Sequence, residues 1–388
     1  MSETANLQKN YEKDNFPLGI IPLSGALELG DKINKHLLSW HSEDLLGQET
    51  GERDTYIINS SCPRFNTGDA KGQVFETVRG FDLYIICDVG NYSVRYKMFG
   101  ESVPMSPDDH FQDLKRVISA ISGKAERISV VMPILYGGRQ HKRSGRESLD
   151  GAMSLQELET MGVRNLITFD AHDPRVQNAT PLMGFDNAMP TYQVLKALFK
   201  NVKDLKIDKE NMMIVSPDEG AMNRNMYYSS VLGLDLGMFY KRRDYSTIVN
   251  GRNPIVAHEY LGSDVKGKDI FVCDDILATG DSLLTLCTDL KKAGAGRIFL
   301  CATYGLFTEG VEKFEKAYND GLFTNVLATN LTYRTPKLLS EPWYIDVDCS
   351  KYIAYFILAM HQNRAVTSLH EPHSKIKALL EKYPGYNN

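Results

Sequence analysis

The stretch "IFVCDDILATGDSLL", Ile270 to Leu284, decides the fold class and points to a site. Its apolar first half is typical of a buried strand, and that strand ends on two adjacent aspartates, Asp274 and Asp275. A small-residue turn, "LATGDS", then leads into a helical pattern. Because adjacent carboxylates repel each other and are costly to bury, we expect the chain to use them on a ligand.

The composition is that of a globular protein with room for two domains. The chain has 388 residues, of which 43% are hydrophobic and 24% charged. Its net charge of -5 argues against general nucleic-acid binding. The first residues lack the apolar core of a signal peptide, and no later run approaches the roughly 18 uncharged apolar residues of a membrane span. We therefore expect a cytoplasmic protein that binds neither nucleic acid nor a membrane.

Strand and helix patterns alternate in the first half of the chain, and the alternation restarts in the second half. Strands are expected from Phe81 and from Arg127, with helices over 108–125 and 191–202. This alternation predicts an α/β fold in two tandem domains, each a mainly parallel sheet flanked by helices. The expected parts are a mobile N-terminal extension (1–16), an N-terminal domain (17–188), a C-terminal domain (189–348), a segment that completes the fold (349–369) and a tail (370–388).

The end of the strand suits a phosphorylated sugar. Ligands of open parallel sheets bind beyond the carboxyl ends of the strands, where Asp274 and Asp275 are expected. Two fixed acceptors can hold vicinal hydroxyls, and the turn that follows offers backbone N–H groups at a helix start, an arrangement that receives phosphate. The alternative is structural, with Asp281 or Ser282 capping the helix and the two acids forming a solvated strand end.

This stretch resembles the phosphoribosyl pyrophosphate binding motif shared by phosphoribosyltransferases and phosphoribosyl pyrophosphate synthetases. Further segments resemble synthetase motifs and occur in the order of that family across residues 17–369. They are the adenine-binding segment and its strand, "PRFNTGD…VFETVRGFDLYII"; the nucleotide loop, "YGGRQHKRSGRESL"; the metal segment, "ITFDAHDPRVQNA"; the strand end "VSPDEGAMNR"; and the catalytic loop, "YKRRD". The resemblance is to the ribose-phosphate diphosphokinase family, and it implies that both domains are phosphoribosyltransferase-like.

The resemblance implies a reaction for nucleotide biosynthesis. The diphosphoryl group of ATP would pass to the 1-hydroxyl of ribose 5-phosphate, giving AMP and 5-phosphoribosyl 1-pyrophosphate. Charge must be neutralised as the sugar oxygen attacks the β-phosphorus, which asks for Mg2+ and cationic side chains rather than a covalent nucleophile. The family commonly forms dimers and hexamers, so the resemblance also implies a homo-oligomer.

Catalytic and metal-binding roles carry over to four residues. Lys241 and Arg243 match the catalytic Lys-x-Arg and would stabilise the transferring phosphates, whereas a solvated basic turn is the alternative. His172 and Asp218 match the residues that hold Mg2+ with the ATP phosphates. Without the resemblance, His172 is better explained as a hydrogen-bonded structural histidine and Asp218 as a turn residue. Asp170 either orients His172 or ends a strand.

Substrate-binding roles carry over in the same way. Phe65 would stack on adenine and Asp69 would read the base edge, although a Phe beside a polar turn is more often part of a core. Arg139 and Gln140 match nucleotide-binding positions, and a surface ion pair is the alternative for Arg139. The positions matched to ribose 5-phosphate are Asp274 and Asp275 for the hydroxyls, with Thr279, Gly280 and Ser282 around the 5-phosphate.

The chain departs from the pattern of the family at three positions. Ala278 replaces a usual Asp, Asp281 a usual Gly, and His141 a usual Asp. These departures support an alternative function, a catalytically silent regulatory subunit that binds nucleotide and assembles with an active synthetase. Four segments look like additions to a compact synthetase, namely the residues before Pro17, 48–61, 92–109 and those after Leu369.

Overall fold

The computed structural model describes residues 16–42, 53–243 and 255–386, with the backbone alone at 42, 241–243 and 255–258. Residues 1–15 of the expected extension and 48–52 of the expected addition lie outside the described residues. The chain divides into two compact units. Unit 1 comprises Met1–Thr168, Arg175–Asp186 and Ser350–Leu369; unit 2 comprises Phe169–Pro174, Asn187–Cys349 and His370–Asn388. The domain bounds expected from the sequence stay a prediction beside this division.

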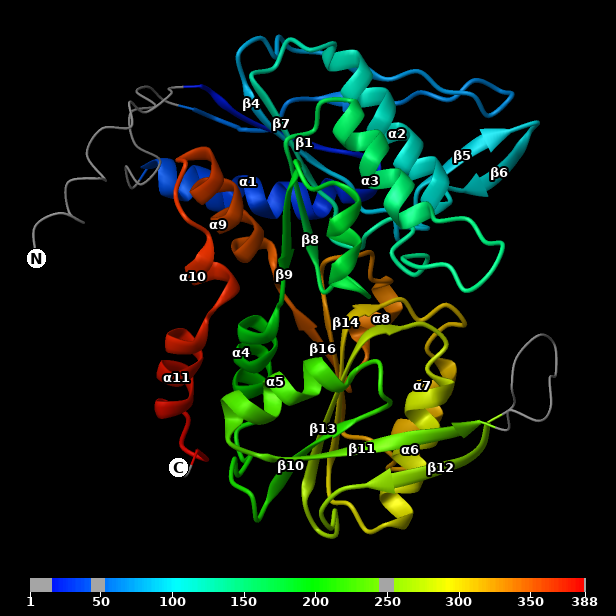
Figure 1. The fold of residues 1–388 in the computed structure, drawn as a ribbon, viewed down its shortest axis with the longest axis vertical. Helices are drawn as coiled ribbons and strands as arrows, with labels where there is room; N and C mark the ends of the chain where they lie inside the picture. The colour runs from blue at the N-terminus through cyan, green and yellow to red at the C-terminus, as the bar shows by residue number, and fades with distance from the viewer. Residues whose placement is uncertain (1–15, 43–52, 244–254, 387–388) are drawn as a thin grey trace, which may run out of the picture. The chain divides into compact units, whose positions relative to one another are not determined.

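The first sheet has the strand order β1-β4-β7-β8-β9, and the pairs β1/β4, β4/β7 and β7/β8 are parallel (Figure 1). Strands β1 and β4 are buried along their whole length, as parallel strands covered by helices require, whereas the edge strand β9 is mostly only partly buried. Helices α1 and α9 lie on one face, and α2 and α3 on the other. The bounds are β1 (Leu18–Pro22), β4 (Asp82–Ile86), β7 (Arg127–Val131), β8 (Asn165–Phe169), β9 (Gly184–Ala188), η1 (Ser24–Ala26), α1 (Leu27–Ser42), α2 (Pro107–Ile121), α3 (Asp150–Thr160), η2 (Pro174–Ala179), α9 (Ser350–His361) and α10 (Thr367–His370).

The long connection expected over 92–109 contains an antiparallel hairpin of β5 (Arg95–Met98) and β6 (Glu101–Pro104). Its turn residues, Phe99 and Gly100, have φ values of 49° and 87°, the left-handed pair that a two-residue hairpin turn needs. A second short pair, β2 (Ser60–Ser61) and β3 (Gln73–Val74), is also antiparallel. Parts of two expected additions, 92–109 and 48–61, are therefore regular structure.

Helix α9 brings a late part of the chain back into unit 1, beside α1 (Figure 1). The rings of Trp40 and Tyr355 stack with their centroids 4.5 Å apart. At the start of α9, the side chains of Ser350 and His36 are 3.3 Å apart. The buried side of α9 thus packs within unit 1, and this unit combines parts of the chain that lie far apart in the sequence.

The second sheet has the order β12-β11-β10-β13-β14-β15-β16, and its printed pairs are parallel except β11/β12 at one edge. The expected fold class, α/β with mainly parallel sheets, is confirmed. Helices α4 and α5 cover one face and α6 and α7 the other (Figure 1). The bounds are α4 (Thr191–Asn201), β10 (Met212–Ser216), α5 (Met222–Leu232), β11 (Asp235–Arg243), β12 (Ile255–Leu261), β13 (Asp269–Leu277), α6 (Asp281–Lys292), β14 (Ile298–Gly305), α7 (Glu312–Asn319), β15 (Asn325–Thr329), α8 (Pro336–Ser340), β16 (Tyr344–Val347) and α11 (His373–Glu381).

An aromatic cluster fixes α7 against the sheet of unit 2. Phe314 of α7 packs on Trp343, with ring centroids 5.9 Å apart, and on Phe307 at 4.9 Å. Phe314 and Trp343 are almost fully buried. Burial of such large rings stabilises this corner of the unit and determines where the neighbouring residues of α7 lie.

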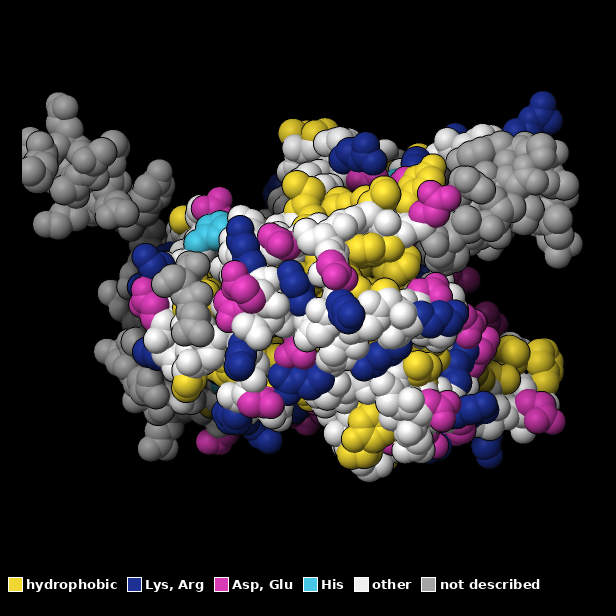
Figure 2. Space-filling model, turned by 90° about the horizontal axis from the view of Figure 1, so that it is seen from below, with side chains coloured by type: hydrophobic (Ala, Val, Ile, Leu, Met, Phe, Trp, Pro, Cys, Tyr) yellow, Lys and Arg dark blue, Asp and Glu magenta, His cyan; other side chains and the backbone are white. Residues whose placement is uncertain are grey.

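The surface mixes charges of both signs. On the face in Figure 2, Lys and Arg side chains lie among Asp and Glu side chains, and hydrophobic side chains form separate small groups. Among the residues described, no helix combines the length and the apolar character needed to cross a membrane.

Candidate active site

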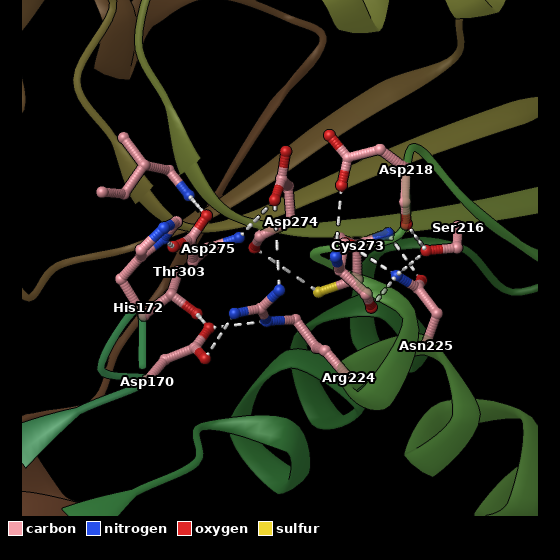
Figure 3. A network of polar contacts seen from close by, with 12 residues as sticks. Asp170, His172, Ser216, Asp218, Arg224, Asn225, Cys273, Asp274, Asp275 and Thr303 are labelled. Atoms are coloured by element: carbon pink, nitrogen blue, oxygen red, sulfur yellow. Dashed lines mark hydrogen bonds and ion pairs between the residues drawn. The ribbon is translucent and has the colours of Figure 1, made fainter. Parts of the chain in front are cut away.

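Three acidic side chains gather where parallel strands of unit 2 end. Residues Ile270–Cys273 of β13 are buried, and burial decreases at Asp274 and Asp275. Strand β10 lies next to β13 in parallel, and Asp218 follows its last residue, Ser216. Because parallel strands present their carboxyl ends at one edge, the two strand ends bring these acids together (Figure 3).

The side chains of His172 and Asp275 form a close pair. Nδ1 of His172 lies 2.7 Å from Oδ2 of Asp275, whose Oδ1 accepts a hydrogen bond from the Ile276 amide at 2.8 Å. Burial alone would raise the pKa of Asp275, but the His172 contact and the charge of Arg224 outweigh it and lower that pKa. Asp275 is therefore held as a carboxylate that orients the imidazole.

Asp274 is in a different state from its neighbour. Burial and the adjacent Asp275 charge raise the pKa of Asp274 to about 7. Its Oδ1 accepts a hydrogen bond from the Asp275 amide at 2.9 Å, and Nη1 of Arg224 is 4.0 Å away. Asp275 is thus ionised, whereas the ionised form of Asp274 would be stabilised by a positive charge or a hydroxyl donor.

Arg224 was not among the residues selected from the sequence, and it lies in the same network (Figure 3). Its Nε and Nη2 donate to the two oxygens of Asp170 at 2.8 and 2.6 Å, and Thr303 Oγ1 donates to Asp170 at 2.6 Å. Asp170 therefore accepts hydrogen bonds from Arg224 and Thr303, whereas Asp275 is the residue paired with the ring of His172. Asp170 has a φ of 43°, a strained conformation that this double anchoring holds.

Asn225, also missed from the sequence, joins the ends of β10 and β13. It is fully buried; its Nδ2 donates to the carbonyl of Cys273 at 2.7 Å, and its Oδ1 accepts from the Cys273 amide at 3.1 Å. The same Nδ2 lies 3.3 Å from Oγ of Ser216. A polar side chain in the first turn of a helix that follows a buried strand was the sequence signal for both Arg224 and Asn225.

The turn after β13 is held by contacts with Phe314 and with the Thr308 amide. Gly280 has a φ of 84°, and a Cβ at this position would overlap the ring of Phe314. The carbonyl of Ala278 accepts a hydrogen bond from the Thr308 amide at 3.0 Å. Helix α6 begins at Asp281, with the Leu284 amide bonded to the Gly280 carbonyl. The Asp281 amide donates to Oγ1 of Thr279 at 3.4 Å, so the amides of Ser282 and Leu283 are those of the open first turn. Thr279, Gly280 and Ser282 therefore surround the start of a helix.

The expected catalytic pair lies at the end of β11, next to the edge strand β12 of the same sheet. Lys241 and Arg243 end β11, with Lys241 opposite His258 of β12 and a bulge between Arg242 and Arg243. The side chains of the pair lie outside the described part of the chain. Their catalytic role stays a prediction.

The residues expected to bind ATP lie in unit 1. Phe65 is 54% exposed, so it is not a core residue, and Thr67 Oγ1 donates to Asp69 at 3.0 Å within the same turn. Arg139 is exposed. The Gln140 amide nitrogen donates to the Ser148 carbonyl at 3.0 Å and so closes its own loop.

The donor set at the strand ends fits Mg2+ held together with substrate phosphates. Among the described residues, no group of three or more His, Cys, Asp or Glu side chains is arranged to hold a metal ion. Mg2+, however, commonly takes only one or two protein carboxylates and completes its shell with phosphate and water. Burial and the Asp275 charge raise the pKa of Asp274, with a smaller contribution from Asp218, and a bound cation would relieve the repulsion among these carboxylates.

Comparisons with known proteins find similarity along both units of the chain. The model of the N-terminal domain of ribose phosphate pyrophosphokinase matches residues 18–162, and that of the phosphoribosyl transferase domain matches 185–328. Ribose-phosphate pyrophosphokinase A of Dictyostelium discoideum is 25% identical over 88% of this chain and 98% of its own length. The ribose-phosphate pyrophosphokinase of Synechococcus elongatus is 25% identical over 90% and 98%.

The fold has a counterpart among solved structures. The phosphoribosylpyrophosphate synthetase of Mycobacterium smegmatis superposes with a TM-score of 0.70, at 20% identity, over 89% of this chain and 99% of that chain. Both halves of the chain thus match the two domains of one family, in the order of that family. The chain belongs to the ribose-phosphate pyrophosphokinase family.

Proposed function

We propose that the protein transfers the diphosphoryl group of ATP to the 1-hydroxyl of ribose 5-phosphate, giving AMP and 5-phosphoribosyl 1-pyrophosphate. The observation that carries the proposal is the end of β13, where Asp274 and Asp275 precede a turn and the open start of α6. Acceptors for sugar hydroxyls and donors for a phosphate follow each other there in one short segment. The names of the relatives support the same reaction.

On the sugar side, Asp274 and Asp275 receive the ribose hydroxyls. Thr279 and Ser282 offer hydroxyl groups to the 5-phosphate, and Gly280 leaves the backbone open to it. Arg224 keeps Asp274 in place without touching the sugar, since its side chain is 10% exposed and engaged with Asp170. Ribose 5-phosphate is thus held at both ends, which orients its 1-hydroxyl.

In the transfer step, the 1-oxygen of the sugar forms a bond to the β-phosphorus as the hydroxyl releases its proton to water. The bond from the β-phosphorus to the bridging oxygen breaks, and AMP leaves with that oxygen. Lys241 and Arg243 neutralise the charge that develops on the transferring phosphates. Mg2+ bound through His172 and Asp218 would supply further neutralisation of the ATP phosphates.

On the nucleotide side, Phe65 stacks on adenine, Asp69 accepts from the base edge, and Arg139 and Gln140 meet the polar parts of ATP. The exposed ring of Phe65 suits stacking. We also propose a homo-oligomer, a dimer or a hexamer, which sedimentation velocity would measure.

The test is a time course of the purified protein with ATP, ribose 5-phosphate and Mg2+. Equal amounts of AMP and 5-phosphoribosyl 1-pyrophosphate are expected. Lys241→Ala should abolish both products while ATP still binds. Lys209→Ala is the matched control, because this exposed lysine lies 3.9 Å from Asp235 at the start of the same strand, and it should keep full activity.

A wild-type protein that binds ATP and gives no product would contradict the proposal. That result would favour a silent regulatory subunit, in line with the departures at Ala278 and Asp281. Restored product on mixing with an active synthetase of the family would then distinguish a regulator from an unfolded preparation.

A further inference from the structure

Asp281 puts a negative charge at the place where the proposed phosphate site needs positive potential. It is the first residue of α6, directly between Gly280 and Ser282. A carboxylate in the first turn of a helix is favourable for the helix, but it competes with a bound phosphate for the same amides. A binding site for a sugar phosphate therefore needs a means to offset this charge.

Lys313 of α7 supplies an opposite charge at that position. Its Nζ lies 2.8 Å from Oδ1 of Asp281 and 2.7 Å from Oε2 of Glu309. The Asp281 side chain is 70% exposed, so it points away from the packed side of the turn. Hydrogen bonds from Lys313 and then from Thr279 hold the pKa of Asp281 below its usual value.

The position of Lys313 follows from packing. Its neighbour Phe314 is buried against Trp343 and lies directly beneath Gly280, where a Cβ would overlap its ring. The same turn of α7 thus supports the backbone of the loop and presents a cation beside it. The side chain of Lys313 is 26% exposed and that of Asp281 is 70% exposed, so packing restricts the lysine more than the aspartate.

We propose that Lys313 is a positioning residue that holds the Asp281 carboxylate outward and neutralises it, so that the start of α6 can accept the phosphate of a phosphorylated sugar. This inference rests on the proposed function of the loop. Lys313 acts through Asp281 and does not touch the phosphate.

Loss of Lys313 should weaken binding of the phosphate rather than lower the stability of the fold. Exposed ion pairs contribute little to folding, so loss of Lys313 leaves the fold intact. A freed carboxylate near a doubly charged phosphate, however, weakens binding by about 3- to 10-fold at low salt, from the Coulomb energy at high dielectric constant. This weakening shrinks as salt screens the charges.

The experiment is a double-mutant cycle that measures the Kd of ribose 5-phosphate by calorimetry at low and high salt. Lys313→Met should raise the Kd by about 3- to 10-fold. Asp281→Asn should bind at least as tightly as the wild type. The double variant D281N/K313M should return close to the wild-type Kd, because without the carboxylate the lysine has nothing to neutralise. Lys313→Arg, which keeps the charge, should bind like the wild type.

Lys337→Met is the matched control. Lys337 lies 2.8 Å from both Glu312 and Glu315 of α7, so it also links to that helix, but away from the loop. Its loss should leave the Kd unchanged. An unchanged Kd in K313M would overturn the inference. So would a double variant as weak as K313M, since Lys313 would then bind the phosphate itself.

The outcome separates this inference from the proposed reaction. If the wild type binds ribose 5-phosphate with the expected cycle but forms no AMP, the reaction is wrong and the role of Lys313 stands. If AMP forms and the cycle shows no coupling, the role of Lys313 is wrong and the reaction stands. A wild type that does not bind ribose 5-phosphate overturns both.

Discussion

The guanidinium of Arg224 and the carboxylate of Asp170 form a buried two-point ion pair, with Nε 2.8 Å from Oδ2 and Nη2 2.6 Å from Oδ1. Asp170 comes from the segment Phe169–Pro174, which precedes the rest of unit 2 in the chain. The pair therefore attaches that segment, with His172 on it, to α5 and to the strand-end acids. The proposed site depends on this attachment.

Arg224→Met should destabilise the protein strongly. Removal of the guanidinium leaves the buried Asp170 carboxylate without its partner, which costs about 3–5 kcal/mol for pairs of this kind. A fall in the urea midpoint, followed by circular dichroism, measures the loss. Arg297→Met is the control, since its pair with Asp269 and Asp204 is more exposed and should contribute less. Equal losses of stability in the two variants would contradict this prediction, because the buried pair of Arg224 would then contribute no more than the exposed pair of Arg297.

Gly280→Ala should abolish tight binding of the sugar phosphate. The new methyl group meets the ring of Phe314, and the φ of 84° strains any residue with a Cβ. We expect the Kd of ribose 5-phosphate to rise more than about 10-fold, since roughly 1.4 kcal/mol of lost binding free energy is already tenfold.

Gly321→Ala separates the two causes at Gly280. Gly321 has a φ of 72°, but a Cβ there meets nothing within 4 Å. This variant should lose about 1 kcal/mol of stability through backbone strain alone and keep the wild-type Kd. Equal binding by the wild type and Gly280→Ala would contradict the account of the loop.

His110 should make the stability of unit 1 depend on pH. Burial lowers the pKa of this side chain below its usual 6.5, and its Nε2 lies 2.7 Å from the Asn91 carbonyl oxygen. The unfolded chain therefore takes up the proton first, and stability falls as the pH drops from 6.5 to the folded-state pKa. The urea midpoint of the wild type should decline more over this window than that of His110→Gln. Parallel declines would show that the pKa of His110 is the same in the folded and unfolded states.

His172→Asn should raise the Mg2+ concentration needed for AMP formation. Loss of a ligand or of its orienting partner weakens metal binding by about 10- to 100-fold in comparable sites. A Mg2+ titration of the initial rate, with saturating substrates, measures the shift. His373→Asn, at the start of α11, is the matched control and should titrate like the wild type. A normal Mg2+ titration of His172→Asn would remove this residue from the proposed metal site.

The sequence predicted the parts of the molecule that depend on local pattern. The apolar run before Asp274 predicted β13, and the small residues after it predicted the turn, because burial and backbone freedom are readable position by position. Arg224 and Thr303 were missed because their importance comes from one partner, Asp170, that lies far away in the chain. The hairpin tip at Phe99 and Gly100 was readable in principle, since alternating strand residues flank it.

Lys313, the partner of Asp281, could not be predicted from the sequence for the same reason. Nothing in the residues around Lys313 indicates that this side chain would meet the start of α6. The contact depends on the buried ring of Phe314, whose packing partner Trp343 comes later in the chain. Charge balance at the loop is therefore a property of the folded unit, and sequence reasoning could only register Asp281 as a departure.

The return of α9 to unit 1 sets the order in which the chain can mature during synthesis. Trp40 of α1 lacks its stacking partner until Tyr355 has been made. At typical rates of about 5–20 residues per second, the ribosome needs on the order of half a minute to reach α9 after finishing α1. Unit 1 is therefore incomplete until Ser350–His361 has been synthesised, and a nascent chain arrested before Ser350 would lack the helix that packs on α1.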